Sequence, residues 1–337
     1  MKLSIVAAVM AACSTVLSSP VHEKFKHGPL NVTTNGTTVW NRSNHSNISG
    51  GAAGAVGTKL KVIITGGSVP LSNASQFTNV EWQTLFNASS TLNITQLYNV
   101  ASTVNQTLQD DTYSGVVIVS NQRSVETLGF FSAVVFDTNK TVVVSDDYAS
   151  GIYVAKDYGS QFRGALTVAQ KSGLIYSGVF APAERDASGV PVGLLYDKQV
   201  NWFMEPSLPL LIDTTSPIRT NYSNFTTTNI STTPVVPIIF DGNFSQTVVN
   251  RLTGSINGLV VAVPDFASNS TASTLSSTQI PVVFAQVSSE IPFVSGDDVP
   301  SDAIAAGYLS PIKAQVLVSI AAANNVTSPA SVAQLFP

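Results

Sequence analysis

The sequence has little of what most enzyme chemistry requires. Its 337 residues include one cysteine, Cys13, and three histidines, His22, His27 and His45, all within the first 45 positions. A folded body without histidine or cysteine cannot form a Ser-His-Asp or Cys-His nucleophile system, or an ordinary zinc site. We therefore expect no metal and no cofactor. Hydroxyl, lysine and carboxylate groups are the chemistry that remains.

Charge is also scarce. Lys, Arg, Asp and Glu make up 11% of the chain, and the formal net charge is −4. A nucleic-acid binder needs a basic surface, so this class of partner is excluded. No window offers about 18 uninterrupted apolar residues, so we expect no membrane span. The hydrophobic content of 44% is ample for a buried core.

The N-terminus has the pattern of a secretory signal peptide, which we expect to cover residues 1–19. Lys2 precedes an apolar run over residues 3–12, and small residues follow. A bacterial lipoprotein cysteine is the alternative interpretation of Cys13, but Met10 fits that motif poorly. Removal of the signal peptide would leave a chain without disulfides.

Most asparagines stand in acceptor sites for N-linked glycans. Of the 23 asparagines, 16 begin an Asn-x-Ser/Thr triplet, far more than chance would give. We therefore predict a secreted, extracellular glycoprotein of a eukaryote, with the cell wall or periplasmic space of a eukaryotic microbe as an option. The predicted acceptors are Asn31, Asn35, Asn41, Asn44, Asn47, Asn73, Asn87, Asn93, Asn105, Asn139, Asn221, Asn224, Asn229, Asn243, Asn269 and Asn325.

Composition also divides the chain into segments. Residues 20–57 are polar and of low complexity, which predicts a disordered glycosylated segment. Residues 213–234 are rich in Ser, Thr, Asn and Pro, which predicts a linker. The segments 58–212 and 235–337 are expected to form a larger N-terminal and a smaller C-terminal α/β domain.

Hydrophobic periodicity predicts strands that alternate with helices in both segments. In the first, we expect one strand to begin at Lys59 and further strands over residues 80–86, 115–120, 141–145 and 174–181. The helices there are expected over residues 93–108, 124–135 and 160–171. In the second, we expect strands over 235–240, 258–263 and 280–286, with helices at 244–252 and 311–323. The alternation indicates a doubly wound α/β fold with right-handed crossovers.

The strand that begins at Lys59 runs straight into Gly66, Gly67 and Ser68. Glycines allow positive φ angles and a close approach of the backbone to a ligand, and open α/β sheets bind ligands at the carboxyl ends of their strands. A dinucleotide fingerprint would need a third glycine, which is missing here. The turn is therefore a candidate functional site at which Ser68 presents its hydroxyl group.

This strand and its TGGS turn, the larger parallel domain, the linker, the smaller domain and a closing GYLSPIKA segment at residues 307–314 resemble the bacterial-type L-asparaginase/glutaminase family. The resemblance covers roughly Lys59 to Phe336. It implies an asparaginase-like two-domain α/β fold and an amidohydrolase that converts asparagine to aspartate and ammonia. It also implies a homo-oligomer, a dimer or tetramer, that takes a small amino-acid-like ligand.

Carried over residue by residue, the resemblance implies a nucleophile at Ser68, where the family has threonine, and a supporting lysine at Lys171. Ser89 and Ser90 match the substrate-binding end of the second strand. The family's tyrosine on a mobile loop is missing from residues 69–79. Serine keeps the hydroxyl, so attack on an amide needs only a group that removes the proton.

The departure from the family is greatest after the predicted strand 115–120. The second catalytic threonine corresponds to Gln122, and the substrate-binding aspartate corresponds to Arg123. A cation in place of a carboxylate repels the ammonium group of an amino acid. Lys171 would also have no hydroxyl to activate. The resemblance therefore implies an asparaginase-like protein with impaired catalysis, a pseudoenzyme.

The residues leave two alternative functions open. One is an active, divergent amidohydrolase that uses Ser68 with help from Lys171, and the other is a non-enzymatic extracellular or cell-surface glycoprotein on the same scaffold. Gln122 and Arg123 could bind an anion at the start of a helix. Glu126 is interpreted as a carboxylate in the first turn of that helix.

Overall fold

The computed structural model describes most of the chain after the first 57 residues. The residues described are 58–67, 76–169, 171–182, 189–221, 230, 233–264, 278–288 and 291–337. They belong to one compact unit that starts at Ala53. The predictions for residues 1–19 and 20–57 lie outside the described residues, and so does Ser68.

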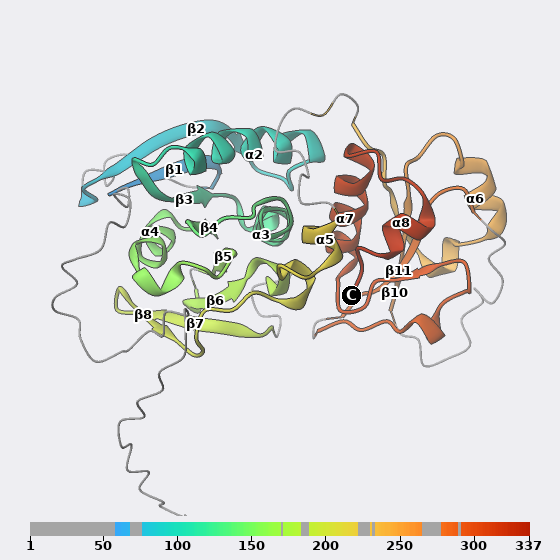
Figure 1. Ribbon diagram of the computed structural model, residues 1–337. Helices are drawn as coiled ribbons and strands as arrows, with labels where there is room; N and C mark the ends of the chain where they lie inside the picture. Colours follow the sequence, from blue (N-terminus) through green and yellow to red (C-terminus); the bar gives the residue numbers. More distant parts are fainter. Residues whose placement is uncertain are drawn as a thin grey trace, which may run out of the picture. The chain divides into compact units, whose positions relative to one another are not determined.

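The larger sheet of the described residues has the strand order β2-β1-β3-β4-β5-β6-β7-β8 (Figure 1). Its strands are β1 (Lys59–Gly66), β2 (Val80–Ala88), β3 (Tyr113–Val119), β4 (Thr141–Ser145), β5 (Ala165–Val168), β6 (Leu174–Ser177), β7 (Pro191–Tyr196) and β8 (Gln199–Trp202). The first five pair in parallel, and β6 to β8 continue the sheet antiparallel. Because β1 lies between β2 and β3, the strand order reverses at β1, where doubly wound sheets bind ligands.

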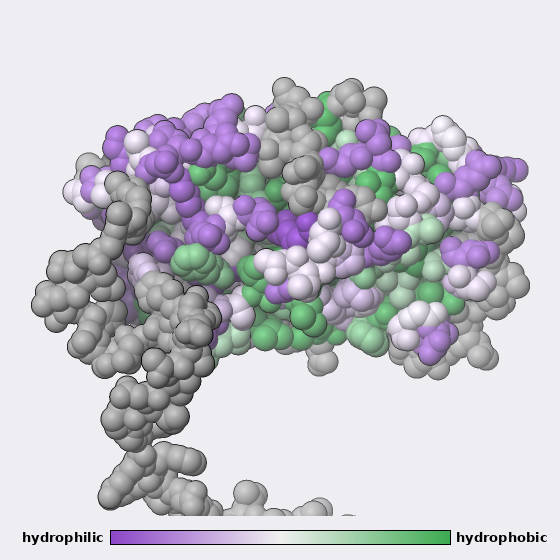
Figure 2. Space-filling view, in the orientation of Figure 1, coloured by the Kyte–Doolittle hydropathy of each residue, from purple (hydrophilic) through white to green (hydrophobic). Residues whose placement is uncertain are grey.

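Helices cover both faces of this sheet. They are α2 (Ile94–Gln109), α3 (Gln122–Val135) and α4 (Tyr148–Lys156). Alternation along β3 sends Val116 and Ile118 into the core formed with α2 and α3, whereas Val117 joins the core formed with α4. The outer face of α2 is polar, and Figure 2 shows hydrophilic side chains gathered over β2 and α2.

The smaller sheet is parallel, with the order β12-β11-β10-β9. Its strands are β9 (Ile238–Phe240), β10 (Leu259–Val263), β11 (Val282–Gln286) and β12 (Ile304–Ala305), and its helices are α6 (Gln246–Leu252), α7 (Pro311–Ala323) and α8 (Pro329–Ala333). Short 3₁₀ segments are η2 (Tyr158–Ser160), η3 (Gly178–Phe180), η4 (Leu210–Ile212), η5 (Asp241–Asn243) and η6 (Gly296–Asp298). Helix α7 packs on β10 and also contacts α3, so one core cluster spans both sheets.

The prediction of a helix over residues 160–171 was wrong. This segment contains β5, and the helix lies earlier, as α4. Phe162 and Gly164 have φ angles of 61° and 66°, which no right-handed helix can contain. All four residues of β5 are buried, and periodicity cannot distinguish so short a buried strand from a helix.

The other long elements were predicted within a few residues. The strand expected over 174–181 ends at Ser177 and is followed by η3. The hairpin of β7 and β8 was not predicted. Its turn residues Asp197 and Lys198 have φ angles of 46° and 64°, the pattern of a type I′ turn. Sequence signals for that turn are normally Asn-Gly or Asp-Gly, so this hairpin had no clear signature.

The segment predicted as a linker begins with structure. Helix α5 (Pro217–Thr220) places Arg219 against the end of α3, where its guanidinium donates to the main-chain oxygens of Val134 at 2.7 Å and Ala133 at 2.8 Å. These carbonyls have no partner within the helix, so Arg219 caps the C-terminus of α3. The architecture confirms the predicted α/β class with a larger and a smaller sheet. No helix in the described ranges is long and apolar enough to cross a membrane.

Candidate functional site

The carboxyl ends of β1, β2 and β3 meet at one edge of the larger sheet. A Cβ atom on Gly66 would lie 2.4 Å from the carbonyl oxygen of Ala88 and 3.1 Å from the backbone nitrogen of Asn121. Gly67 has a φ of 82°, and its Cβ would lie 3.0 Å from the carbonyl oxygen of Ser120. Both positions therefore require glycine, because any side chain would push the strand ends apart.

Asn121, the residue before α3, ties these strand ends together. Its amide nitrogen Nδ2 donates to the carbonyl oxygens of Ala88 and Ser90, both at 3.0 Å. Ser124 adds a second tie, because its Oγ accepts from the Leu92 N–H at 3.2 Å. The start of α3 is thus fastened to the segment that joins β2 to α2.

The structure brings four of the predicted site residues to this edge. Ser89 and Ser90 follow β2, Gln122 and Arg123 form the first turn of α3, and all four are exposed. The Ser90 carbonyl accepts from Asn121, the neighbour of Gln122. Ser68 lies outside the described residues. Its role as a nucleophile stays a prediction.

Lys171 lies elsewhere. It is exposed in the turn between β5 and β6, not on the helix expected there. It lines a cavity of about 320 Å³ with residues from α4, such as Tyr153, and from the β7–β8 turn, such as Asp197. None of the four edge residues lines this cavity.

The end of β4 completes the edge. The hydroxyl of Ser145 donates to the Asp147 carbonyl oxygen at 2.7 Å. The carboxylate of Asp147 accepts from the backbone N–H and the hydroxyl of Ser150, at 2.8 and 2.7 Å, and caps α4. This carboxylate is therefore used to start a helix.

A buried polar cluster that the sequence did not predict lies where α3 contacts α7. The Ser310 hydroxyl donates to Glu126 Oε1 at 2.6 Å, and Lys313 Nζ lies 4.0 Å from the same oxygen. Glu126 is 4% exposed and Lys313 is 7% exposed. The interpretation of Glu126 as a first-turn carboxylate was wrong, because it is the fifth residue of α3 and faces the core. Its position four residues before the buried Phe130 was the available signal.

Burial shifts the pKa values of both members of this pair. Desolvation raises the pKa of Glu126, partly offset by Lys313 and by the hydrogen bond from Ser310. Desolvation lowers the pKa of Lys313 from 10.5 to about 8, partly offset by the charge of Glu126. Ser310 also caps α7, its Oγ accepting from the Lys313 N–H at 3.3 Å. The cluster thus joins the two helices and starts one of them.

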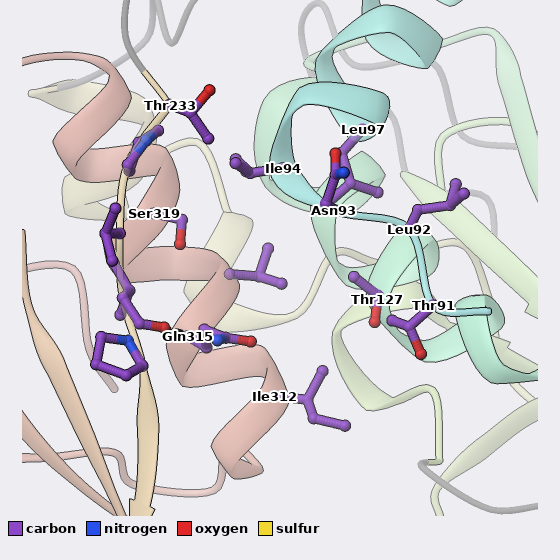
Figure 3. A pocket seen from close by; sticks show the side chains of 15 residues that line it. Thr91, Leu92, Asn93, Ile94, Leu97, Thr127, Thr233, Ile312, Gln315 and Ser319 are labelled. Atoms are coloured by element: carbon purple, nitrogen blue, oxygen red, sulfur yellow. Dashed lines mark hydrogen bonds between the residues drawn. The ribbon is translucent and has the colours of Figure 1, made fainter.

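A second cavity, of about 510 Å³, lies between the start of α2, the segment 233–237 and α7. Figure 3 shows Thr91 and Thr127 on one side of it and Gln315 and Ser319 on the other. None of Ser89, Ser90, Gln122 and Arg123 lines this cavity. The chain that leaves the carboxyl edge after β2 reaches the cavity at Thr91. In the described part of the chain, no group of three or more His, Cys, Asp or Glu side chains is placed to hold a metal ion.

Comparison with known proteins gives two curated relatives and one shared fold. No protein-family model matches the chain. The chain is 43% identical to protein YGP1 of Saccharomyces cerevisiae over 357 aligned positions, which cover all of both chains. It is 41% identical to the sporulation-specific wall maturation protein of the same yeast, covering all of this chain and 99% of that one. Neither name states an asparaginase activity.

Among solved structures, the chain is similar to the crystal structure of a probable cytoplasmic L-asparaginase from Campylobacter jejuni. The TM-score is 0.62, and the match covers 83% of this chain and 99% of that one. Sequence identity is 15%, so the likeness is one of fold. The predicted asparaginase-like fold is confirmed.

Proposed function

Because the chain belongs to the same family as yeast protein YGP1 and the yeast sporulation-specific wall maturation protein, we propose that it is a secreted glycoprotein of the cell wall. It keeps an asparaginase-like fold but does not hydrolyse asparagine. The observation that carries this proposal is the use of polar groups at the carboxyl edge of the larger sheet, where they bind the protein's own main chain.

Amide hydrolysis by this type of fold needs a hydroxyl beside a base, and groups that bind the ammonium and carboxylate of the substrate. Here the hydroxyls of Thr65 and Ser145 donate to main-chain carbonyl oxygens, and the amide of Asn121 does the same. The carboxylate of Asp147 caps α4. Groups engaged in this way support a structural use of the edge.

The charge at the carboxyl edge also supports a non-catalytic role. Arg123 is exposed in the first turn of α3, where the helix dipole is positive. Both charges repel an α-ammonium group, and the resemblance places an aspartate for that group at this position. A free amino acid therefore binds poorly here.

The alternative of an active amidohydrolase needs Lys171 beside the site residues at the carboxyl edge, of which the structure describes Ser89, Ser90, Gln122 and Arg123. Lys171 instead lines the cavity formed by α4 and the β7–β8 turn, together with Ser150 and Tyr153. Gln122, which takes the place of the second catalytic threonine, does not line that cavity. This separation favours the non-catalytic proposal.

Secretion is supported by the placement of the glycan acceptors. Five described acceptors are exposed, namely Asn87, Asn93, Asn139, Asn221 and Asn325. Asn105 is half-buried, and none of these six is buried. Asn87 lies near the end of β2, an edge strand of the sheet, where a glycan would also prevent pairing with another chain.

Rescue of wall maturation tests the proposal. The gene would be expressed in a yeast strain that lacks the wall maturation relative, as wild type, Ser68→Ala or Lys171→Ala. We expect all three to reach the cell wall and to restore wall maturation equally. A Ser68→Ala protein that is secreted at the wild-type level but fails to restore it would contradict the proposal. The homo-oligomer implied by the resemblance stays a proposal, which light scattering of the secreted protein would check.

A further inference from the structure

The cavity between α2, residues 233–237 and α7 has the size of a ligand pocket. Its volume of about 510 Å³ lies in the range of pockets that hold small molecules. Its deep part is formed by buried side chains such as Leu97 and Val316, and its rim by exposed residues such as Asn93 and Thr233. Figure 3 shows Ile94 and Ile312 on opposite sides of it.

The chemistry of the lining selects a neutral occupant. None of the lining residues carries a charge, and most are aliphatic or proline. The polar groups are hydroxyls and amides, from Thr91, Thr127, Gln315 and Ser319 among others. An amino acid or a phosphate would lose its hydration without a counter-charge. A neutral sugar with an acetamide group, which has apolar C–H faces and several hydrogen-bonding groups, fits this lining.

One buried hydroxyl in the cavity lacks a partner. Thr127 is 3% exposed, and its Oγ1 makes no hydrogen bond with any part of the chain that the structure describes. A buried hydroxyl left in this state costs about 1–3 kcal/mol. The oxygen itself is buried, so an occupant that offers an acceptor, such as a sugar hydroxyl or an acetamide oxygen, removes this cost only when the Thr127 side chain rotates toward the cavity.

The rim carries a glycan acceptor that is held in place. Asn93 caps α2, its Oδ1 accepting from the Gln96 N–H at 2.9 Å, and Gln96 Oε1 accepts from the Asn93 N–H at 3.0 Å. This capping box fixes the side chain of Asn93, an exposed residue of the cavity lining, and leaves Nδ2, the atom that bears a glycan, out of the cap. Thr95 completes the triplet and pairs with Thr233 across the rim at 3.2 Å.

We infer that the N-linked glycan of Asn93 folds into this cavity, so that its first N-acetylglucosamine units bridge α2 to residues 233–237 and α7. In the attachment step, Nδ2 of Asn93 bonds to C1 of the sugar, the C1–O bond to a lipid pyrophosphate donor breaks, and the amide proton passes to a base of the transferase. The inference rests on the secreted, glycosylated state proposed above.

A glycan held in the cavity should be less accessible to an endoglycosidase than the glycans of neighbouring acceptors. Asn105 and Asn139 do not line the cavity, so their glycans extend into solvent. Native secreted protein would be treated with an endoglycosidase, and release would be followed by glycopeptide mass spectrometry. We expect the Asn93 glycan to be released at least tenfold more slowly than the Asn139 glycan, and at the same rate after denaturation. Equal rates in the native protein would overturn the inference.

Stability gives a second, independent test. Thr95→Ala removes the acceptor triplet but keeps the Asn93 cap, and it would be made both in a secreting yeast and in bacteria, which add no glycan. We expect the melting temperature to fall by about 2–4 °C more in the yeast protein than in the bacterial protein. Asn139→Gln is the matched control, with no such difference. Equal shifts from Thr95→Ala in both hosts would overturn the inference.

Occupancy separates the failure of this inference from that of the proposed function. If Asn93 is unmodified in the secreted protein while Asn139 carries a glycan, the inference fails and secretion stands. If no acceptor is glycosylated in a eukaryotic host, the proposed function fails with it. A neutral fluorescent probe, N-phenyl-1-naphthylamine, should bind the bacterial protein and not the secreted one. Equal binding would show an open cavity and contradict the inference.

Discussion

The carboxyl edge of the larger sheet and the contact between α3 and α7 use polar residues in opposite ways. At the edge, Gln122 and Arg123, the residues that the resemblance aligns with the family's working groups, are exposed. At the helix contact, Glu126 and Lys313 are buried and lie 4.0 Å apart. Ionisable groups with strongly shifted pKa values usually mark functional sites. Here the two such groups, Glu126 and Lys313, lie at a helix contact within the core that spans both sheets.

This contrast shows which polar residues are built into the core of the fold. Buried charges are costly, and a structure tolerates them only with a partner and hydrogen bonds. The α3–α7 contact supplies both, through Ser310 and Lys313. The edge has no such buried group among Ser89, Ser90, Gln122 and Arg123, because all four are solvated. Changes at the helix contact should therefore affect stability strongly, whereas changes to these four edge side chains should affect it little.

The largest effect is expected from Glu126→Gln. Removing one charge of a buried pair leaves Lys313 without its partner, and the free energy of unfolding should fall by about 3–5 kcal/mol. Urea unfolding followed by circular dichroism would measure it. The exposed Glu205→Gln serves as control, with a change within about 0.5 kcal/mol. Similar losses from the two substitutions would remove the contrast between the contact and the surface.

The double variant Glu126→Gln/Lys313→Met sharpens the same point. Replacing both charges by groups of similar size removes the desolvation cost along with the attraction, so most of the lost stability should return. The measurement is again the urea midpoint and slope. A double variant as unstable as Glu126→Gln would mean that the pair acts through something other than charge.

The next effect is a pH dependence. Because burial lowers the pKa of Lys313 to about 8 from 10.5, the unfolded chain binds more protons than the folded chain between these values. Stability must then rise with pH through this window, with a slope approaching about 1.4 kcal/mol per pH unit, and level off below pH 8, where both states hold the proton. Urea unfolding from pH 7.5 to 10 would show it. The double variant should lack this slope, and identical profiles would contradict the assignment.

A smaller loss is expected from Asn121→Ala at the edge. The substitution removes two hydrogen bonds to the carbonyl oxygens of Ala88 and Ser90, so the free energy of unfolding should fall by about 1–3 kcal/mol. Asn99→Ala, on the exposed face of α2, is the matched control and should be neutral or slightly stabilising. If both changes are neutral, Asn121 does not hold the strand ends together.

The smallest effects are expected from the predicted site residues themselves. Arg123→Gln and Lys171→Ala should each change the free energy of unfolding by less than about 0.5 kcal/mol, because both side chains are exposed. Urea unfolding would again measure this change. A loss above about 1 kcal/mol in either variant would show that the residue has a structural role like that of the α3–α7 contact.

The fold was readable from the sequence because its long elements follow simple periods. The valine-rich runs of β3 and β4 and the apolar spacing of α2 each permit one interpretation. The failures were local. A four-residue buried strand, β5, looks the same as a helix segment, and the turn at Asp197 and Lys198 lacks glycine. Neither could be resolved without knowing what packs around it.

The candidate site was predicted less well than the fold. Ser89, Ser90, Gln122 and Arg123, which the resemblance assigned to one site, lie at one edge because strand ends of a parallel sheet meet there, and their role in binding stays a prediction. Sequence spacing could not place Lys171, since that placement depended on the wrong helix. The link between Glu126 and Ser310, which are 184 positions apart, is a tertiary contact without a local signature. Alignment to a family pattern also does not show which polar side chains form hydrogen bonds with the protein's own main chain.

Ammonia release from L-asparagine and L-glutamine tests the central claim most directly. The secreted, glycosylated protein would be compared with its Ser68→Ala variant and with a bacterial asparaginase as a positive control. We expect wild type and Ser68→Ala to release ammonia at the same background rate. Release by the wild type that exceeds the background and is lost in Ser68→Ala would contradict this expectation, and would show that the edge still performs catalysis.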